Sequence, residues 1–326
     1  MSETSTQSDF CIYSYDFEKN GNAINAKKAG VSNNSLLTWW HLDATHEGSE
    51  DYLRNSIKLN PVIAHALVDE DTRPRIESFE DGLMVILRGI NTLDPDHPEE
   101  MVSLRIWIDE KRIITLRRRK LKTIEDLANH LEKNTRSLKT SADILSYIID
   151  KLLTKIEPVI DDLAEDCDEH EEAIIDNPEA GQRSAIAKTR KKSITLRRYL
   201  APQRDALNQL RNVEYPFINK QNTRSFQESS STVTRLIEDI DMLRERTQII
   251  QDELTNTLSD RLNRNMYILS VIAAIFLPLG FLTGLLGINV GGIPGSENPM
   301  AFWIFMAMLA VIVIGQVILF KKMKWF

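Results

Sequence analysis

Three side chains that can bind a metal ion fall within one helical turn of the sequence. Cys167 is followed by His170 and Glu171, and steps of three and four residues place side chains on one face of an α-helix. Thiolate, imidazole and carboxylate groups are all ligands of Zn²⁺, so this cluster is a candidate partial zinc site. One helical turn seldom completes a tetrahedral site, and a small buried cysteine beside surface charges is the alternative interpretation.

Two runs of opposite charge lie in and after this segment. The acidic run comprises Asp161, Asp162, Glu165, Asp166, Asp168, Glu169, Glu171 and Glu172. The basic run comprises Arg190, Lys191, Lys192, Arg197 and Arg198. Their charges predict pairing between neighbouring solvated helices, and a surface that attracts cations is the second interpretation.

A denser basic cluster lies earlier in the chain, at Arg117, Arg118, Arg119, Lys120 and Lys122. It could contact nucleic acid or anionic lipid, but a solvated strand end is preferred because no aromatic platform accompanies it. The chain has 40 basic and 47 acidic side chains and a net charge of −7. This acidic balance argues against a nucleic-acid-binding protein.

No motif in the sequence predicts catalysis. The patterns G-x-x-x-x-G-K-[ST], H-E-x-x-H and G-x-S-x-G are absent, so we expect neither catalytic residues nor a bound cofactor. The two cysteines, Cys11 and Cys167, are too few for a disulfide framework and indicate a reducing, cytoplasmic setting.

Strand-like and helical patterns interleave at the start of the chain and predict an α/β domain over residues 1–135. The expected strands lie at 10–17, 36–42, 75–79, 83–90, 103–108 and 112–116, and the expected helices around 49–68 and 123–133. Residues 136–217 then hold two helical stretches, 140–177 and 178–212, separated by Asn177-Pro178. We expect these stretches to form an antiparallel helical hairpin.

A very long helix follows, because neither Pro nor Gly occurs from Thr223 to Ala274. Its cytoplasmic part, residues 218–265, carries apolar residues at alternating steps of three and four from Val233 to Leu254. This heptad seam predicts a stalk that packs along its length. Copies of the same chain are the expected partners.

Two uncharged apolar runs, residues 266–286 and 300–320, are each long enough to cross a hydrocarbon core of roughly 30 Å as a helix. Arg261 and Arg264 precede the first span and lysines occur in residues 321–326, whereas the 287–299 loop has no basic residue. We therefore expect a multi-pass membrane protein with both termini in the cytoplasm; the resemblance described below implies the cell inner membrane.

Neither span contains Asp, Glu, His, Lys or Arg, which argues against intramembrane ion pairs and proton relays. Two helices cannot enclose a water-filled path, so conduction would require several copies of the chain. Small or polar residues such as Ser270, Ala273 and Gly280 recur on one face of the first span; a tight interface without a pore explains this spacing equally well. Pro278 frees the carbonyl of Ala274, which either bends the helix or offers an oxygen to a lumen.

The first span ends in Gly287-Ile288-Asn289, followed by a Gly- and Pro-containing loop and a second span with a lysine-rich tail. This arrangement resembles the Gly-x-Asn signature of the CorA-type divalent cation transporter superfamily. Residues 72–75, 87–91, 105–108 and 284–295 are similar to the ZntB zinc transporter branch. The Mg²⁺-transporting relatives commonly have Met in place of Ile288.

The resemblance implies an α+β protein that forms a homopentamer, with a cytoplasmic α/β funnel and five long pore-lining helices. It implies a pore lined by Asn263, Met266, Leu269, Ser270, Ala273, Leu277 and Gly280. It also implies that Gly287, Ile288 and Asn289 form a selectivity motif at the outer mouth. There the side-chain oxygen of Asn289 would contact the water around a divalent cation.

The function implied by the resemblance is proton-linked uptake of Zn²⁺, with Cd²⁺, Ni²⁺ or Co²⁺ as further substrates. All six histidines and both cysteines precede the stalk, so the zinc assignment rests on the resemblance and not on pore ligands. A Mg²⁺/Co²⁺ channel of the same superfamily is the alternative. A membrane-anchored coiled-coil scaffold without transport is the alternative from another class.

Overall fold

The computed structural model describes residues 10–18, 23–25, 35–70, 72–133, 138–288, 295 and 298–322. It divides into two compact units, Met1–Asp252 and Glu253–Phe326. Asn289, the loop residues 290–294 and the tail residue Lys324 lie outside the described residues.

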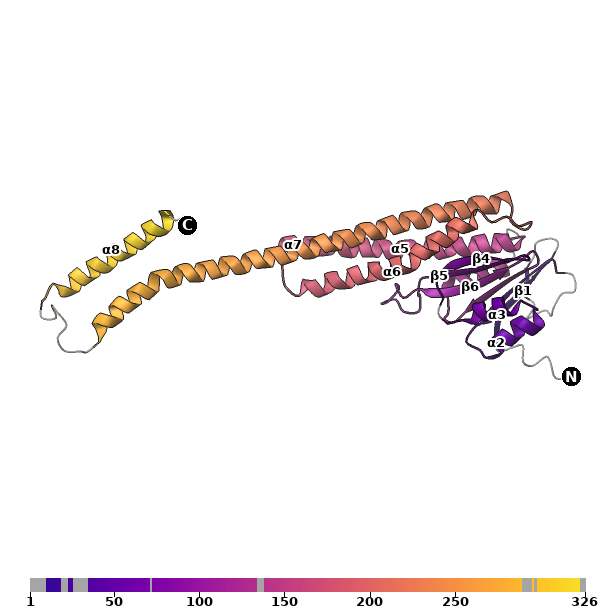
Figure 1. Cartoon of the computed structure of the whole chain (residues 1–326), viewed down its shortest axis with the longest axis horizontal. Helices are drawn as coiled ribbons and strands as arrows, with labels where there is room; N and C mark the ends of the chain where they lie inside the picture. Colours follow the sequence, from indigo (N-terminus) through magenta and orange to yellow (C-terminus); the bar gives the residue numbers. More distant parts are fainter. Residues whose placement is uncertain are drawn as a thin grey trace. The chain divides into compact units, whose positions relative to one another are not determined.

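A mixed sheet of seven described strands forms the centre of the first unit (Figure 1). The strands are β1 (Cys11–Phe17), β2 (Ala23–Asn25), β3 (Leu37–Asp43), β4 (Arg75–Ser78), β5 (Leu83–Gly89), β6 (Val102–Ile108) and β7 (Arg112–Arg117). Their spatial order is β2-β1-β3-β7-β6-β5-β4, with β3 and β7 parallel and the other neighbours antiparallel. The six expected strands are present, and β2 was missed because three residues show no readable period.

Residues 48–68 form three short segments where one helical pattern was expected around 49–68. They are α2 (Gly48–Asp51), the π-helix η1 (Tyr52–Ser56) and α3 (Pro61–Val68). Asn60 caps α3, since its side-chain oxygen accepts a hydrogen bond from the Val62 backbone N–H at 2.9 Å. Pro61 takes the first helical position, where a missing N–H loses no intrahelical bond. The single-helix expectation was therefore wrong at this Asn-Pro pair.

The longer helices are α4 (Lys122–Glu132), α5 (Ser141–Asp176), α6 (Gln182–Leu210), α7 (Lys220–Gly287) and α8 (Ala301–Lys322). α5 begins at a capping box in which the side chains of Thr140 and Asp143 accept hydrogen bonds from each other's backbone N–H. α5 and α6 pack antiparallel. Gln182 Nε2 at the start of α6 donates to Ala173 O near the end of α5, and the later residue Thr189 of α6 contacts the earlier residue His170 of α5. The first part of α7 runs beside them (Figure 1).

The sheet is covered on both faces, since consecutive residues of β5 are buried. On one face of the sheet, Met84 and Ile86 belong to a hydrophobic core cluster that also contains Leu67 of α3. The other face packs against α5 and α6. At Gly89 an added Cβ would lie only 2.5 Å from the Leu152 Cδ2 atom of α5, so glycine permits this close approach of strand and helix.

The heptad seam of α7 is buried within the chain itself. From Val233 to Ile250 its residues have at most 4% of their surface exposed. An ion pair between Arg235 and Glu157, with 2.6 Å between nitrogen and oxygen, joins α7 to α5. The expectation that copies of the chain cover this stretch was therefore wrong. α5 and α6 of the same chain cover it, because each of the three helices buries its apolar stripe against the other two.

Candidate functional site

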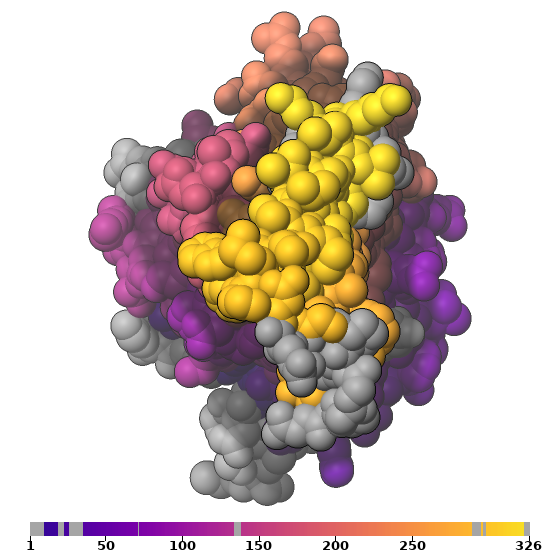
Figure 2. Space-filling model, turned by 90° about the vertical axis from the view of Figure 1, so that its left-hand side faces the viewer, coloured from indigo at the N-terminus to yellow at the C-terminus, as the bar shows by residue number. Residues whose placement is uncertain are grey.

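The candidate site lies in the second unit, which consists of the end of α7 and of α8. α7 is one uninterrupted helix of 68 residues, about 100 Å long at about 1.5 Å per residue. α7 and α8 are long and apolar enough to cross a membrane. Large apolar side chains of α8 are exposed, and Figure 2 shows them uncovered, in yellow. Such a surface requires lipid or another protein as its neighbour.

The positions predicted to line a pore all lie within the helical part of α7. They are Asn263, Met266, Leu269, Ser270, Ala273, Leu277 and Gly280. Steps of three and four keep such positions on one helical face, and Met266 and Leu277 are 59% and 71% exposed. Val271, Ile275 and Leu279, on the opposite side of the helix, are less exposed. Apart from Ala273, which is half-buried, the predicted positions are therefore exposed in a single chain.

An apolar groove of about 470 Å³ lies between α7 and α8. Gly280 and Thr283 of α7 and Ala310 of α8 are among its lining residues. The Thr283 hydroxyl donates to Leu279 O at 2.9 Å, so this polar group is satisfied within its own helix. Gly280 thus lies at the border between the predicted pore face and the contact with α8.

Pro278 does not interrupt α7, and the carbonyl that it frees has found a partner. Proline lacks an N–H, so Ala274 O loses its usual helical donor. Gln316 of α8 donates its Nε2–H to Ala274 O at 3.3 Å. Of the two alternatives left open for this oxygen, the hydrogen bond to Gln316 argues against its being offered to a lumen. Gln316 was missed, although it is the single amide side chain in the apolar run 300–320.

The predicted selectivity motif lies at the C-terminal end of α7. Gly287 is the last residue of the helix, and Ile288 follows it with an exposed side chain. Asn289 lies outside the described residues. The role of these three residues therefore stays a prediction.

The cluster around Cys167 does not form a ligand set. The Cys167 side chain is buried, and burial raises the pKa of its thiol to about 11, so the metal-binding thiolate is disfavoured. His170 Nε2 lies 3.1 Å from Thr189 Oγ1, and Glu171 accepts from Arg246 Nε at 3.0 Å. Across the described part of the chain, no group of three or more His, Cys, Asp or Glu side chains is placed to hold a metal ion.

The charge runs of α5 and α6 do not pair with each other, contrary to expectation. Asp168 and Glu171 of α5 both pair with Arg246 of α7. Arg197 of α6 pairs with Asp241 of α7, with 2.5 Å between nitrogen and oxygen. No ion pair joins α5 to α6 among the described residues, because the first part of α7 lies beside both helices and supplies the partners.

The comparison with known proteins decides the family. The family model for CorA-like Mg²⁺ transporter proteins matches residues 34–322. The chain belongs to the CorA family. This membership, with two candidate membrane-spanning helices on a mixed-sheet domain, confirms the expected superfamily and a transporter rather than an enzyme.

Two CorA-family relatives match almost the whole chain. The zinc transport protein ZntB of Yersinia enterocolitica is 35% identical over 316 residues, covering 96% of this chain and 95% of the relative. The divalent cation transporter CmaX of Pseudomonas aeruginosa is 33% identical over 320 residues, covering 96% of each.

Solved structures show the same fold. The full-length CmaX protein superposes with a TM-score of 0.84 at 33% identity, covering 97% of this chain and 98% of that chain. The CorA magnesium transporter of Methanocaldococcus jannaschii has a TM-score of 0.81 at 21% identity, with 96% and 98% covered. At that identity the second match supports the fold alone.

Proposed function

We propose that this CorA-family chain is a zinc transporter that works as a homopentamer in the cell inner membrane. The observation that carries the proposal is the largely uncovered face of α7, which runs from Asn263 to Gly280 and borders the contact with α8. A two-helix unit cannot enclose a path for an ion, so this face requires copies of itself. Five such helices would line one pore, with both termini in the cytoplasm.

The proposed division of labour follows the chain. Residues 1–135 form the cytoplasmic domain, 136–217 the hairpin, 218–265 the stalk and 266–286 the pore-lining span. Residues 287–299 form the outer loop with the Gly287-Ile288-Asn289 motif, 300–320 the second span and 321–326 the cytoplasmic tail.

The proposed substrate is a hydrated divalent cation. The lining face offers apolar, hydroxyl and amide groups and no titratable side chain, so it suits an ion that keeps its water. The identity with ZntB of Yersinia enterocolitica supports Zn²⁺, and we extend the substrates to Cd²⁺, Ni²⁺ and Co²⁺. Because neither span can carry a proton, we assign the proposed proton link to acidic residues of the cytoplasmic domain.

The test is zinc entry into liposomes that contain the full chain and a zinc-sensitive dye, with and without a proton gradient. Entry that accelerates with the gradient and is insensitive to Mg²⁺ is expected. Entry that Mg²⁺ blocks and the gradient leaves unchanged would instead identify a Mg²⁺/Co²⁺ channel. Absence of flux for every cation would favour a scaffold without transport.

The same assay tests the Gly287-Ile288-Asn289 motif through a variant of Asn289. Asn289→Ala should slow Zn²⁺ entry about tenfold or more, because it removes a hydrogen bond to the water of a charged ion. Gln227→Ala is the matched control, since it removes an exposed amide from the part of α7 that belongs to the first unit. Equal flux in both variants would remove Asn289 from the pathway.

A further inference from the structure

A cavity of about 580 Å³ lies in the first unit between the sheet and α6. Arg88 of β5 lines it, together with Arg118 and Arg119, which directly follow β7. α6 contributes Lys188, Lys191, Lys192 and Arg198. With three glutamates in the same lining, the net charge of the cavity is +4 in a chain whose total is −7.

The lysines of α6 are available to a ligand. Lys188, Lys191 and Lys192 follow steps of three and four, so they lie on one helical face. Their ammonium groups have no ion-pair or hydrogen-bond partner among the described residues, since the acidic run of α5 pairs with α7 instead. Three uncompensated cations on the wall of one cavity repel each other, and a bound anion would relieve this repulsion.

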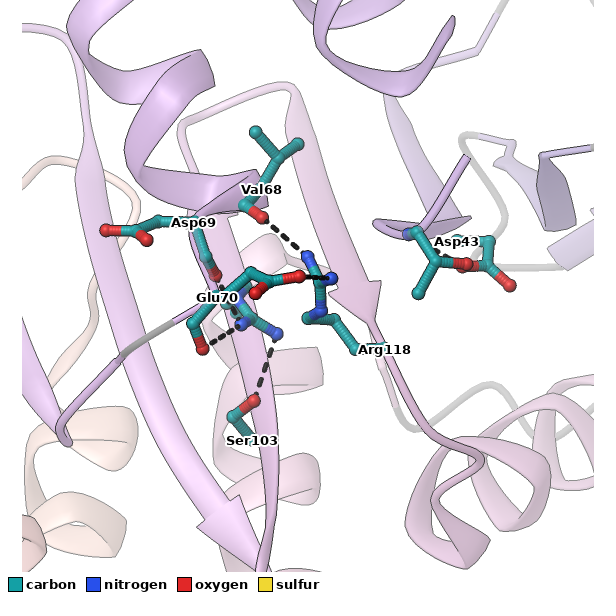
Figure 3. Close-up of polar contacts among 8 residues, drawn as sticks. Asp43, Val68, Asp69, Glu70, Ser103 and Arg118 are labelled. Carbon is teal, nitrogen blue, oxygen red and sulfur yellow. Dashed lines mark hydrogen bonds and ion pairs between the residues drawn. The ribbon is translucent and has the colours of Figure 1, made fainter. Parts of the chain in front are cut away.

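On the sheet side of the cavity, hydrogen bonds and an ion pair hold the arginine side chains in fixed positions. Arg118 donates to Val68 O at 3.1 Å and pairs with the Glu70 carboxylate (Figure 3). Beside it the buried Arg105 donates to Asp69 O and Ser103 Oγ at 2.6 and 3.0 Å. Burial and, after it, the nearby charges of Arg118 and Arg88 together lower the pKa of Arg105 to about 10.

The carboxylates of the lining do not cancel this charge at the lysines. Glu70 is held by Arg118, Glu99 lies 3.4 Å from His97 Nδ1, and Glu100 lies 3.9 Å from Arg119. Each of them therefore has a partner on the sheet side. The α6 side keeps its three free lysines.

A planar cation completes the wall. The Arg88 guanidinium lies 4.3 Å from the centre of the Tyr199 ring, and that of Arg198 lies 4.9 Å from it. Arg88 also donates to the backbone oxygens of Met101 and Thr72, at 2.9 and 2.7 Å, which fixes its plane. Oriented guanidinium groups recognise phosphate oxygens in bidentate fashion, and lysines supply charge around them.

We propose that this cavity is a binding site for a small anion that carries a chain of two or more phosphate groups. The cations are spread over three elements around one cavity, so a ligand with several charged groups contacts more of them than a single phosphate does. All residues that line the cavity belong to the first unit, and none of them is among the positions proposed to line the pore. It accounts for the basic residues at 118–119 and 188–198, which the transport proposal leaves without a role.

The test is calorimetric titration of the purified full chain with pyrophosphate in a buffer that contains EDTA, which keeps metal–phosphate complexes out of the signal. We expect saturable binding that weakens as NaCl rises, and weaker binding of orthophosphate. The triple variant Lys188→Gln, Lys191→Gln, Lys192→Gln should bind pyrophosphate about tenfold or more weakly, because it loses three charge-assisted contacts. These lysines are at least partly exposed, so the fold should be retained.

The matched control is Lys111→Gln, Lys139→Gln, Lys220→Gln, which removes three exposed positive charges away from the cavity. It should bind pyrophosphate as the native chain does. Equal affinity of both triple variants, or no binding by the native chain, would overturn the proposal. A further titration distinguishes the source of the phosphate chain: equal affinity for ATP and tripolyphosphate supports an inorganic chain, and tighter binding of ATP supports a nucleotide.

Discussion

His41 on β3 shows how one buried side chain acquires a defined protonation state. The Thr115 hydroxyl donates to Trp40 O at 3.2 Å, so its lone pairs accept from Trp39 Nε1 at 2.9 Å and from His41 Nδ1 at 2.8 Å. The proton of His41 therefore lies on Nδ1. Burial and, after it, the charge of Arg117 together lower the pKa of His41 to about 3.

This histidine predicts a loss of stability in mild acid. In the unfolded chain a histidine with a pKa of about 6.5 takes up a proton, whereas folded His41 stays neutral down to about pH 3. Its contribution is complete above about pH 6.5 and decreases as the pH falls, by about 2 kcal/mol at pH 5. Unfolding midpoints of the native chain and of His41→Gln at pH 7 and pH 5 should show a smaller pH dependence in the variant.

The control for this measurement is His65→Gln, because the His65 side chain is 70% exposed. Its pH dependence should equal that of the native chain. If all three proteins lose the same stability between pH 7 and pH 5, His41 is not the neutral buried group described above.

At the scale of elements, the contact between α7 and α8 combines apolar side chains with a hydrogen bond between the two helices. Pro278 leaves Ala274 O without its helical donor, and Gln316 Nε2 supplies the replacement from the other helix. In a hydrocarbon environment no water is present to satisfy such a carbonyl. The proline and the glutamine therefore form a matched pair, one on each span.

This pairing predicts a non-additive mutant cycle. Gln316→Leu should destabilise the full chain in detergent by about 1 kcal/mol, the usual scale of hydrogen bonds between membrane helices. In a Pro278→Ala background the helix regains an N–H for Ala274 O, so the same Gln316→Leu change should cost little. Thermal unfolding midpoints of the four proteins measure the coupling. Additive effects would mean that the hydrogen bond does not contribute to stability.

At the scale of the whole molecule, the covering of α7 changes along its length. The seam from Val233 to Ile250 is buried by the chain's own helices, whereas the face that includes Met266 and Leu277 is uncovered. The first stretch needs no other copy to bury its apolar stripe. The second stretch is where the proposed homopentamer would assemble around an aqueous path.

Cysteine labelling tests this assembly. Leu277→Cys should react with a charged, water-soluble thiol reagent and lose Zn²⁺ flux, because the proposed pore exposes position 277 to water. Val311→Cys, exposed on α8 in the middle of the second span, should not react, because lipid surrounds it. The native Cys11 and Cys167 are buried and give little background.

The mass of the protein–detergent complex, corrected for detergent, should equal five chains. Labelling of both introduced cysteines, or of neither, would contradict a pore lined by α7. A monomeric mass would contradict the assembly itself.

Local patterns in the sequence determined much of the fold. The uncharged runs at 266–286 and 300–320 coincide with α7 and α8 apart from Met300, and alternating or continuously apolar runs located the strands apart from the three-residue β2. Such patterns are readable because burial imposes the period of the element on neighbouring residues. Residues 48–68 were predicted less well, because Asn60 caps a new helix that begins at Pro61 and so divides the single helical pattern that was expected.

Only the tertiary structure decided which partner each surface meets. Asp168 and Glu171 pair with Arg246 of α7 and not with a basic residue of α6. The lysines of α6 instead line a cavity together with residues of the sheet. Gln316 and Ala274 are 42 residues apart, so no local period relates them. The sequence determined which residues must be buried or paired. Their partners depend on chain segments brought together from far apart, and such contacts leave no signal in the spacing of neighbouring residues.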